Sequence, residues 1–90
     1  MRLVAIVDMA TGFEADGRRY EDEVLALLGR HGGTLESRLY GTDGATEVQT
    51  ISFATREGYE SALVDPDRLA LRERLGPAAP TTRVILVTSA

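Results

Sequence analysis

The sequence predicts an α+β fold in which four strands and two helical regions follow one another in the order β-α-β-β-α-β. Strand-like and helix-like hydrophobic patterns succeed each other in this order along the 90 residues. Residues 3–7 and 84–87 are also apolar at consecutive positions, which is typical of strands that are covered on both faces. Two helices cover only one face of a four-stranded sheet, so we expect a homodimer through the sheet face.

The first strand is predicted over residues 2–9, and a loop then leads to a helix that begins near Asp16. The carboxylate of this residue can cap free backbone amides. Apolar and aromatic residues recur at three- and four-residue steps and predict one stripe that faces the sheet: Tyr20, Val24, Leu27, Leu28 and His31. Gly32 or Gly33 is expected to end this helix.

The middle of the chain predicts a hairpin of two strands, residues 34–40 and 47–54, around the turn Gly41-Thr42-Asp43-Gly44. Alternation along the third strand places Gln49 on the same face as Ile51 and Phe53. Alternation along the second strand predicts two opposite sets of side chains: Leu35, Ser37 and Leu39 against Glu36, Arg38 and Tyr40.

Thr55 is placed to cap a second helix, which Asp65-Pro66 interrupts before a further helical segment. Gly76 and Pro77 stop that segment, and the closing strand is predicted over residues 82–88. The whole order is the split βαβ arrangement called ferredoxin-like: a four-stranded antiparallel sheet with both helices on one face. We expect one domain over residues 1–90.

The composition excludes several chemistries. The chain has no Cys, no Lys, no Trp, no Asn and a single His, so disulfides, thiolate nucleophiles, Schiff bases and Cys-based zinc sites are excluded. We expect no metal site and no cofactor. The lack of Lys and Asn beside abundant Ala, Arg and Gly indicates a GC-rich bacterial genome.

The charge and the hydropathy argue against two classes of partner. The formal net charge of −4 repels a phosphate backbone and an anionic membrane surface, so we expect neither nucleic acid nor membrane as a partner. Asp8 interrupts the apolar N-terminal run, which therefore predicts a strand and not a signal peptide. No apolar stretch approaches the length of a membrane span, and we expect a cytoplasmic protein.

Three short segments resemble a known superfamily: His31-Gly32-Gly33, the run from Phe53 to Glu57 before Tyr59, and Asp65-Pro66 before Leu71-Arg72. They resemble the dimeric α/β-barrel superfamily, and within it small bacterial domains of unknown function and antibiotic-biosynthesis monooxygenase-like proteins. The resemblance covers nearly the whole chain and implies two sheets packed face to face in a dimer. It also implies a pocket in each protomer between its own sheet and helices.

Members of this superfamily include cofactor-free oxygenases that act on electron-rich aromatic polyketides, isomerases, cyclases and haem-binding proteins. The oxygenases often place Asn or Trp in the pocket, and this chain has neither. The fold by itself therefore leaves the activity open.

Two residues are candidates for catalysis. Histidine is the side-chain type whose ordinary pKa lies near neutrality, and His31 lies on the inward stripe, so it can act as a general acid or base. Its alternative role is to interact with the negative end of the helix. Asp8 extends the face of Val4 and Ile6 and acts as a base if its surroundings raise its pKa; otherwise it is a solvated strand-end residue.

Five residues are candidates for ligand binding. Gln49 puts an amide among core side chains, where a ligand, the backbone or water can satisfy it. Arg38 and Tyr40 can bind an anionic or phenolic ligand, or form an ion pair and a rim contact at the dimer interface. Tyr20 and Tyr59 either bury their rings or face an aromatic substrate.

Two hypotheses of function follow from the sequence. The first is a secondary-metabolism enzyme or binding protein for a small hydrophobic, aromatic or polyketide-like molecule. The second is a non-catalytic homo-oligomeric interaction or regulatory module with a filled core. A cavity with convergent polar atoms favours the first, and a solid core favours the second.

Overall fold

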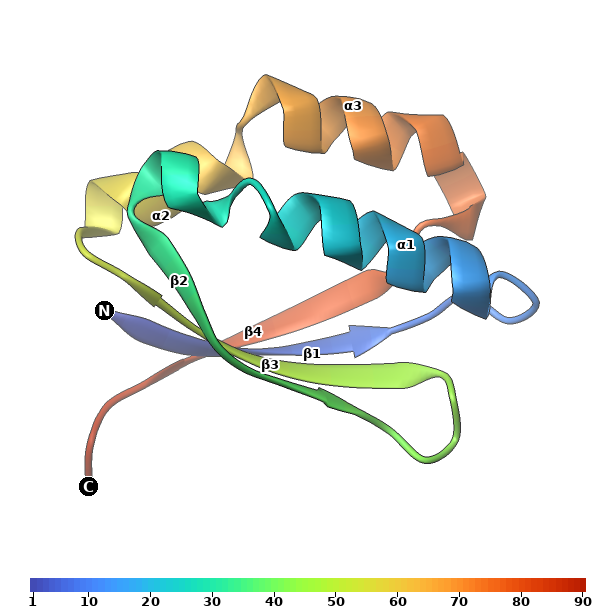
Figure 1. Cartoon of the computed structure of the whole chain (residues 1–90), viewed down its shortest axis with the longest axis horizontal. Coiled ribbons are helices and arrows are strands. Elements are labelled where there is room, and N and C mark those ends of the chain that lie inside the picture. Colours follow the sequence, from blue (N-terminus) through green and yellow to red (C-terminus); the bar gives the residue numbers. More distant parts are fainter.

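The four strands form an antiparallel sheet, and all helices lie on one face of it (Figure 1). The computed structural model describes residues 1–90, and the strand order is β2-β3-β1-β4. The predicted ferredoxin-like α+β fold is thus confirmed. Its elements are β1 (Arg2–Asp8), α1 (Glu14–Leu25), η1 (Leu28–His31), β2 (Gly33–Tyr40), β3 (Thr46–Phe53), α2 (Arg56–Leu63), α3 (Pro66–Leu75), η2 (Gly76–Ala78) and β4 (Thr81–Val87).

The core lies between the central strands and the helices. In β1, Leu3, Ala5 and Val7 are buried on the helix side. Leu3 is paired with Ile51 of β3, and Met9, Leu28 and Phe53 complete the same cluster. The alternating apolar positions of β1 therefore provide one half of the core directly from the sequence.

The other face of the sheet carries no helix (Figure 1). Val4 is paired with Ile85 of β4, and Ile6 is paired with Val48 of β3, so these side chains share this open face. Leu39 on β2, also paired with Val48, is 63% exposed. The chain by itself leaves these apolar side chains of the open face uncovered.

The predicted first helix is in fact two segments. The α-helix α1 ends at Leu25, and a 3₁₀ turn, η1, follows over Leu28–His31. Gly32 ends η1 in the left-handed conformation, with φ of +70°, which glycine adopts without steric cost. The prediction that glycine stops this region is confirmed, whereas the prediction of one continuous helix is wrong.

The second helical region agrees with the predicted interruption. The Thr55 hydroxyl accepts a hydrogen bond from Gly58 N at 3.0 Å and caps α2. The Asp65 carboxylate accepts one from Asp67 N at 2.9 Å and caps α3, with Pro66 in the first turn. None of the helices combines the length and apolar composition that crossing a bilayer requires.

A β-bulge changes the predicted faces of β2. The register with β3 shifts between Leu35 and Ser37, so the alternation restarts after the bulge. Arg38 is therefore opposite the buried Gln49, on the same face as Leu35. The expectation that Leu35 shares a face with Ser37 and Leu39 is wrong. The extra residue of the bulge moves Ser37 and Leu39 to the face opposite Leu35.

Candidate functional site

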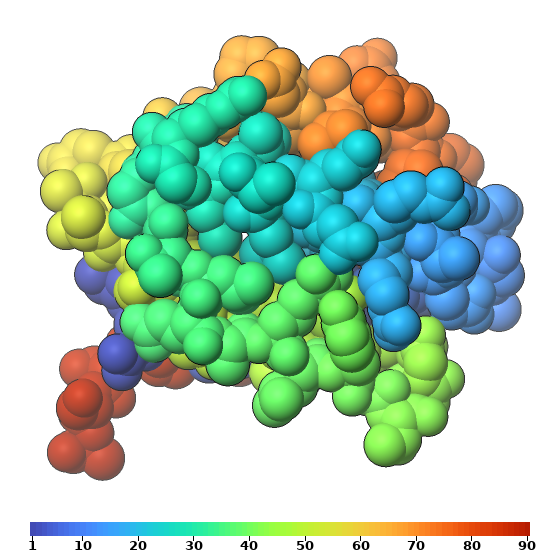
Figure 2. Space-filling model, viewed as in Figure 1, coloured from blue at the N-terminus to red at the C-terminus, as the bar shows by residue number.

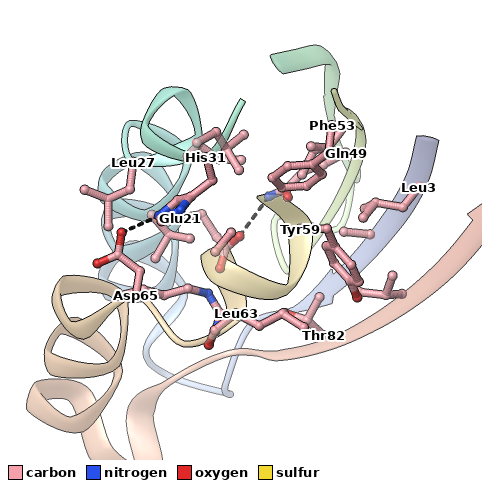
Figure 3. Close-up of a pocket in the computed structure, with 18 of the residues that line it drawn as sticks. Leu3, Glu21, Leu27, His31, Gln49, Phe53, Tyr59, Leu63, Asp65 and Thr82 are labelled. Atoms are coloured by element: carbon pink, nitrogen blue, oxygen red, sulfur yellow. Dashed lines mark hydrogen bonds and ion pairs between the residues drawn. The ribbon is translucent and has the colours of Figure 1, made fainter. Parts of the chain in front are cut away.

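A cavity of about 90 Å³ lies between the sheet and the helices. Its walls are mostly apolar: Leu3, Ile51 and Phe53 come from the sheet, and Leu28 and Tyr59 from the helical side. The rings of Phe53 and Tyr59 lie 5.5 Å apart at 59°, a tilted arrangement that aromatic pairs favour. Figure 3 shows Leu3 of β1, Phe53 of β3 and Tyr59 of α2 around the cavity.

The mouth of the cavity lies between α2 and β4. The exposed members of its lining are Leu63, Thr82 and Val84, and Figure 3 shows Leu63 beside Thr82. On the face seen in Figure 2, the atoms of α1 meet those of the β2–β3 hairpin without a wide opening. The exposed part of the lining thus lies on the β4 side, where Val84 is 40% exposed.

A buried carboxyl and a buried amide form one polar pair in the cavity wall. Gln49 Nε2 donates a hydrogen bond to Glu21 Oε1 at 2.8 Å, drawn as a dashed line in Figure 3. Both residues are buried: Glu21 is 5% exposed and Gln49 is 2% exposed. Burial raises the pKa of Glu21, the Gln49 hydrogen bond lowers it, and the charge of Glu47 adds to the rise.

Glu47 lies behind this pair and is itself fully buried. Arg38 donates to both of its carboxylate oxygens, at 2.8 and 2.9 Å, a bidentate geometry that binds an ionised carboxylate strongly. The Glu47 hydrogen bond in turn raises the pKa of Arg38. Arg18 and Arg38 both lie over the ring of Tyr40, with guanidinium carbons 4.3 and 5.2 Å from its centroid.

A second polar pair in the lining joins η1 to the start of α3. The side chains of His31 and Asp65 are in contact through Nε2 and Oδ2, at 2.7 Å. The hydrogen bond to His31 holds the pKa of Asp65 below its usual range, and the Asp67 backbone amide acts in the same direction. Asp65 is buried, at 4% exposed, and Arg30 lies 3.4 Å from its Oδ2.

The structure brings four of the seven predicted site residues together. His31, Gln49, Tyr20 and Tyr59 all line the cavity. Arg38 and Tyr40 lie outside the lining, in the ion-pair network around Glu47. Asp8 also lies outside it, exposed at the end of β1. The roles of all seven residues remain predictions.

Sequence reasoning missed three charged residues of the lining: Glu21, Asp65 and Arg68. For Glu21 a signal existed, because its spacing from Val24 and Leu25 places it on the inward helical stripe. Asp65 was interpreted only as a helix interruption, and its contact with His31 spans 34 residues.

No group of three or more His, Cys, Asp or Glu side chains is arranged to hold a metal ion.

The chain has the fold of ferredoxin-like α/β proteins, among them antibiotic biosynthesis monooxygenase-like and dimeric proteins. SnoaB from Streptomyces nogalater, a cofactor-independent oxygenase solved in a mutant form, is 20% identical, with a TM-score of 0.75 over 98% of this chain and 90% of that one. An antibiotic biosynthesis monooxygenase-like protein from Nitrosomonas europaea is 12% identical, with a TM-score of 0.73 over 99% and 100%.

A dimeric ferredoxin-like protein from an uncultured marine organism is 14% identical, with a TM-score of 0.60 over 99% of this chain and 95% of that one. No protein-family model matches the sequence, and no curated protein matches it either. The solved structures thus confirm the predicted resemblance at the level of the fold.

Proposed function

We propose that this protein binds a small hydrophobic metabolite, aromatic or polyketide-like, in the cavity between sheet and helices. We further propose that it acts on this metabolite without a cofactor, as an oxygenase, a cyclase or an isomerase. The observation that carries the proposal is the presence of two hydrogen-bonded polar pairs, Glu21–Gln49 and His31–Asp65, in an otherwise apolar wall. Apolar sites with a few convergent polar groups are typical of small-molecule sites.

The fold relatives support a small-molecule role. SnoaB is a cofactor-independent oxygenase, and the Nitrosomonas protein is described as an antibiotic biosynthesis monooxygenase. A base that removes a proton from the bound molecule, within a site that excludes water, is one means by which a protein starts such chemistry without a cofactor.

His31 is the proposed base. The Asp65 carboxylate has a lowered pKa and accepts hydrogen bonds only, so a neutral His31 carries its proton on Nε2. Nδ1 then has the free lone pair, and no group of the chain donates to it. Asp65 thus acts as a positioning residue, which holds the tautomer and orients the ring.

The volume of the cavity limits what it holds. Its volume of about 90 Å³ lies below the ~300–1,000 Å³ of common ligand pockets. We infer that only the reacting end of the ligand enters the cavity. Its remaining apolar part lies in the mouth, against Leu63 and Val84.

The test is turnover of two aromatic probes, the phenol naphthol and the ketone anthrone, followed by oxygen consumption and by mass spectrometry of the products. The His31→Gln variant is expected to lower kcat/KM about 100-fold, while Glu73→Gln, an exposed change on α3, leaves it unchanged. Equal activity of His31→Gln and the parent protein refutes the role of His31. Failure of every probe to bind refutes the small-molecule function.

We also propose that the protein is a homodimer through the open sheet face. Val4, Ile6 and Val48 share this face with Ile85 and the exposed Leu39, and no helix of the chain covers it. A dimeric ferredoxin-like protein is among the structures with this fold. Burial of such side chains stabilises association by ~25 cal/mol per Å² before the cost of ordering is subtracted.

The second candidate function is a non-catalytic homo-oligomeric interaction or regulatory module. The small volume of the cavity favours it, because a nearly filled core needs no ligand. In that case the protein forms a dimer but shows no saturable binding of either aromatic probe. Calorimetric titration of the dimer with naphthol separates the two functions.

A further inference from the structure

We propose that Glu21 and Gln49 form a recognition site for a hydroxyl group, so that the protein selects neutral apolar alcohols or phenols over hydrocarbons and carboxylates. This inference rests on the proposed small-molecule function and adds the chemistry by which the ligand is chosen. It is carried by the orientation of the two side chains, by their burial and by the atoms that they leave without partners.

The orientation of the Gln49 amide follows from its neighbours. Its Nε2 lies 2.8 Å from Glu21 Oε1 and 3.1 Å from Glu47 Oε1, and carboxylate oxygens require a donor. The opposite orientation of the amide would place its oxygen against two acceptors. Both N–H groups of Gln49 are therefore used within the protein, and only its Oε1 is free to meet a ligand.

Two oxygen atoms in the cavity wall lack a partner in the chain. Glu21 uses Oε1 for its contact with Gln49, and no group of the chain hydrogen-bonds to its Oε2. No group donates to Gln49 Oε1 either. Both residues line the cavity and are more than nine-tenths buried. Arg18 Nε is the one fully buried side-chain polar atom that lacks a partner, so these two oxygens lie at the accessible surface of the cavity, where a ligand or water supplies their hydrogen bonds.

Burial, more than the charges around the pair, favours the neutral form of Glu21 by raising its pKa. Arg38 pairs with Glu47 through two hydrogen bonds, one to each carboxylate oxygen. Burial raises the pKa of Glu21, and the charge of Glu47 raises it further, against the lowering effects of Gln49, Arg38 and Arg68. A neutral Glu21 presents an O–H donor beside the Gln49 acceptor.

A donor beside an acceptor selects among ligand groups. A hydroxyl accepts a hydrogen bond from Glu21 and donates one to Gln49 Oε1, so both atoms are satisfied. A ketone leaves the Gln49 oxygen unpaired, and a hydrocarbon leaves both atoms unpaired, which costs binding energy. A carboxylate brings a second negative charge near Glu47 and is rejected.

The sequence supplies a direct probe for this site. Gln49 is the only glutamine and the chain has no asparagine, so a single side-chain NH₂ pair is expected in the amide NMR spectrum of the wild-type chain. Titration with phenol is expected to shift this pair, with an affinity about tenfold higher than that of toluene. Benzoate is expected to leave it unchanged.

Variants at position 21 test the role of the carboxyl. Glu21→Leu is expected to abolish the preference for phenol while toluene still binds, whereas Glu23→Leu, an exposed change on the same helix, retains the preference. Glu21→Gln keeps a hydrogen-bond donor toward the ligand, so this variant is also expected to retain the preference for phenol. If Glu21→Leu does not fold, the order of phenol, toluene and benzoate in the wild-type protein decides.

The outcomes separate this inference from the proposed function. If toluene and phenol bind with equal affinity, or if Glu21→Leu retains the preference for phenol, the hydroxyl site is refuted while the cavity remains a ligand site. If no probe binds, the proposed small-molecule function fails, and the hydroxyl site fails with it.

Discussion

The carboxylate of Asp65 contacts Nε2 of His31 at 2.7 Å, across 34 residues of sequence. The same carboxylate caps α3 through the backbone amide of Asp67, at 2.9 Å. The orientation of the His31 ring is therefore coupled to the position at which α3 begins. The Asp65 side chain thus forms both the local cap of α3 and the long-range contact with His31.

The first prediction concerns this carboxylate. Asp65→Asn keeps an oxygen that caps α3, since Asn and Asp are equivalent N-caps, but it removes the negative charge beside His31. We expect the melting temperature to change little and kcat/KM for the aromatic probes to fall at least about tenfold, because the favoured tautomer is lost. Asp67→Asn is the control, since Asp67 is exposed and contacts Arg30; an equal loss there would contradict the assignment.

The second prediction concerns pH and Glu21. Its pKa is raised in the folded protein, chiefly by burial, so its proton stabilises the fold below the ordinary carboxyl pKa. That contribution is lost as the pH rises through the folded pKa. Glu21→Gln cannot ionise, so its stability relative to the parent protein should increase between about pH 4 and pH 7.

Urea unfolding at several pH values measures this difference, with Glu23→Gln as the control that shows no such trend. A difference between parent and Glu21→Gln that shrinks toward neutral pH would contradict the raised pKa of Glu21.

The third prediction concerns the open sheet face. Ile85→Glu places a charge among apolar side chains of this face, and its burial in a dimer costs several kcal/mol. We expect the dimer dissociation constant to rise at least about 100-fold. Sedimentation velocity at micromolar concentration gives the measurement, and Val64→Glu, at an exposed position after α2, should stay dimeric. A monomeric parent protein would refute the dimer outright.

The fourth prediction concerns the contact that places η1 against α2. A Cβ atom at Gly58 would overlap the backbone carbonyl of His31, so Gly58→Ala must displace η1 or α2. We expect a loss of roughly 1–3 kcal/mol of stability, as for other overpacked sites, and weaker activity because His31 moves. Gly29→Ala meets no atom within 4 Å and is the matched control. Equal stability of the two variants, measured by urea unfolding, would contradict the tight contact.

Most of the architecture was readable from local patterns. The strands were predicted to within one residue of their observed ends, for example residues 2–9 against Arg2–Asp8. The Thr55 cap and the break at Asp65-Pro66 were also predicted. These features depend on neighbours close in sequence: side-chain alternation, caps, and the restricted backbone of proline and glycine.

The candidate site was readable only in part. His31 and Gln49 were placed on inward faces by periodicity, and both line the cavity. Arg38 was assigned to the face opposite Leu35, because the bulge in β2 leaves no signal in the alternation. Glu21 is not among the predicted site residues, since a charged side chain is rarely buried without an ionic partner.

The order of elements, the position of the turns and the need to cover two apolar sheet faces were determined by the sequence alone, because each follows from interactions within a few residues. The tertiary structure alone decided which polar side chains meet. The contacts of Glu21 with Gln49 and of His31 with Asp65 join residues 28 and 34 positions apart. Such pairs form only when the packing of helices on the sheet brings distant segments together and excludes the water that would otherwise solvate them.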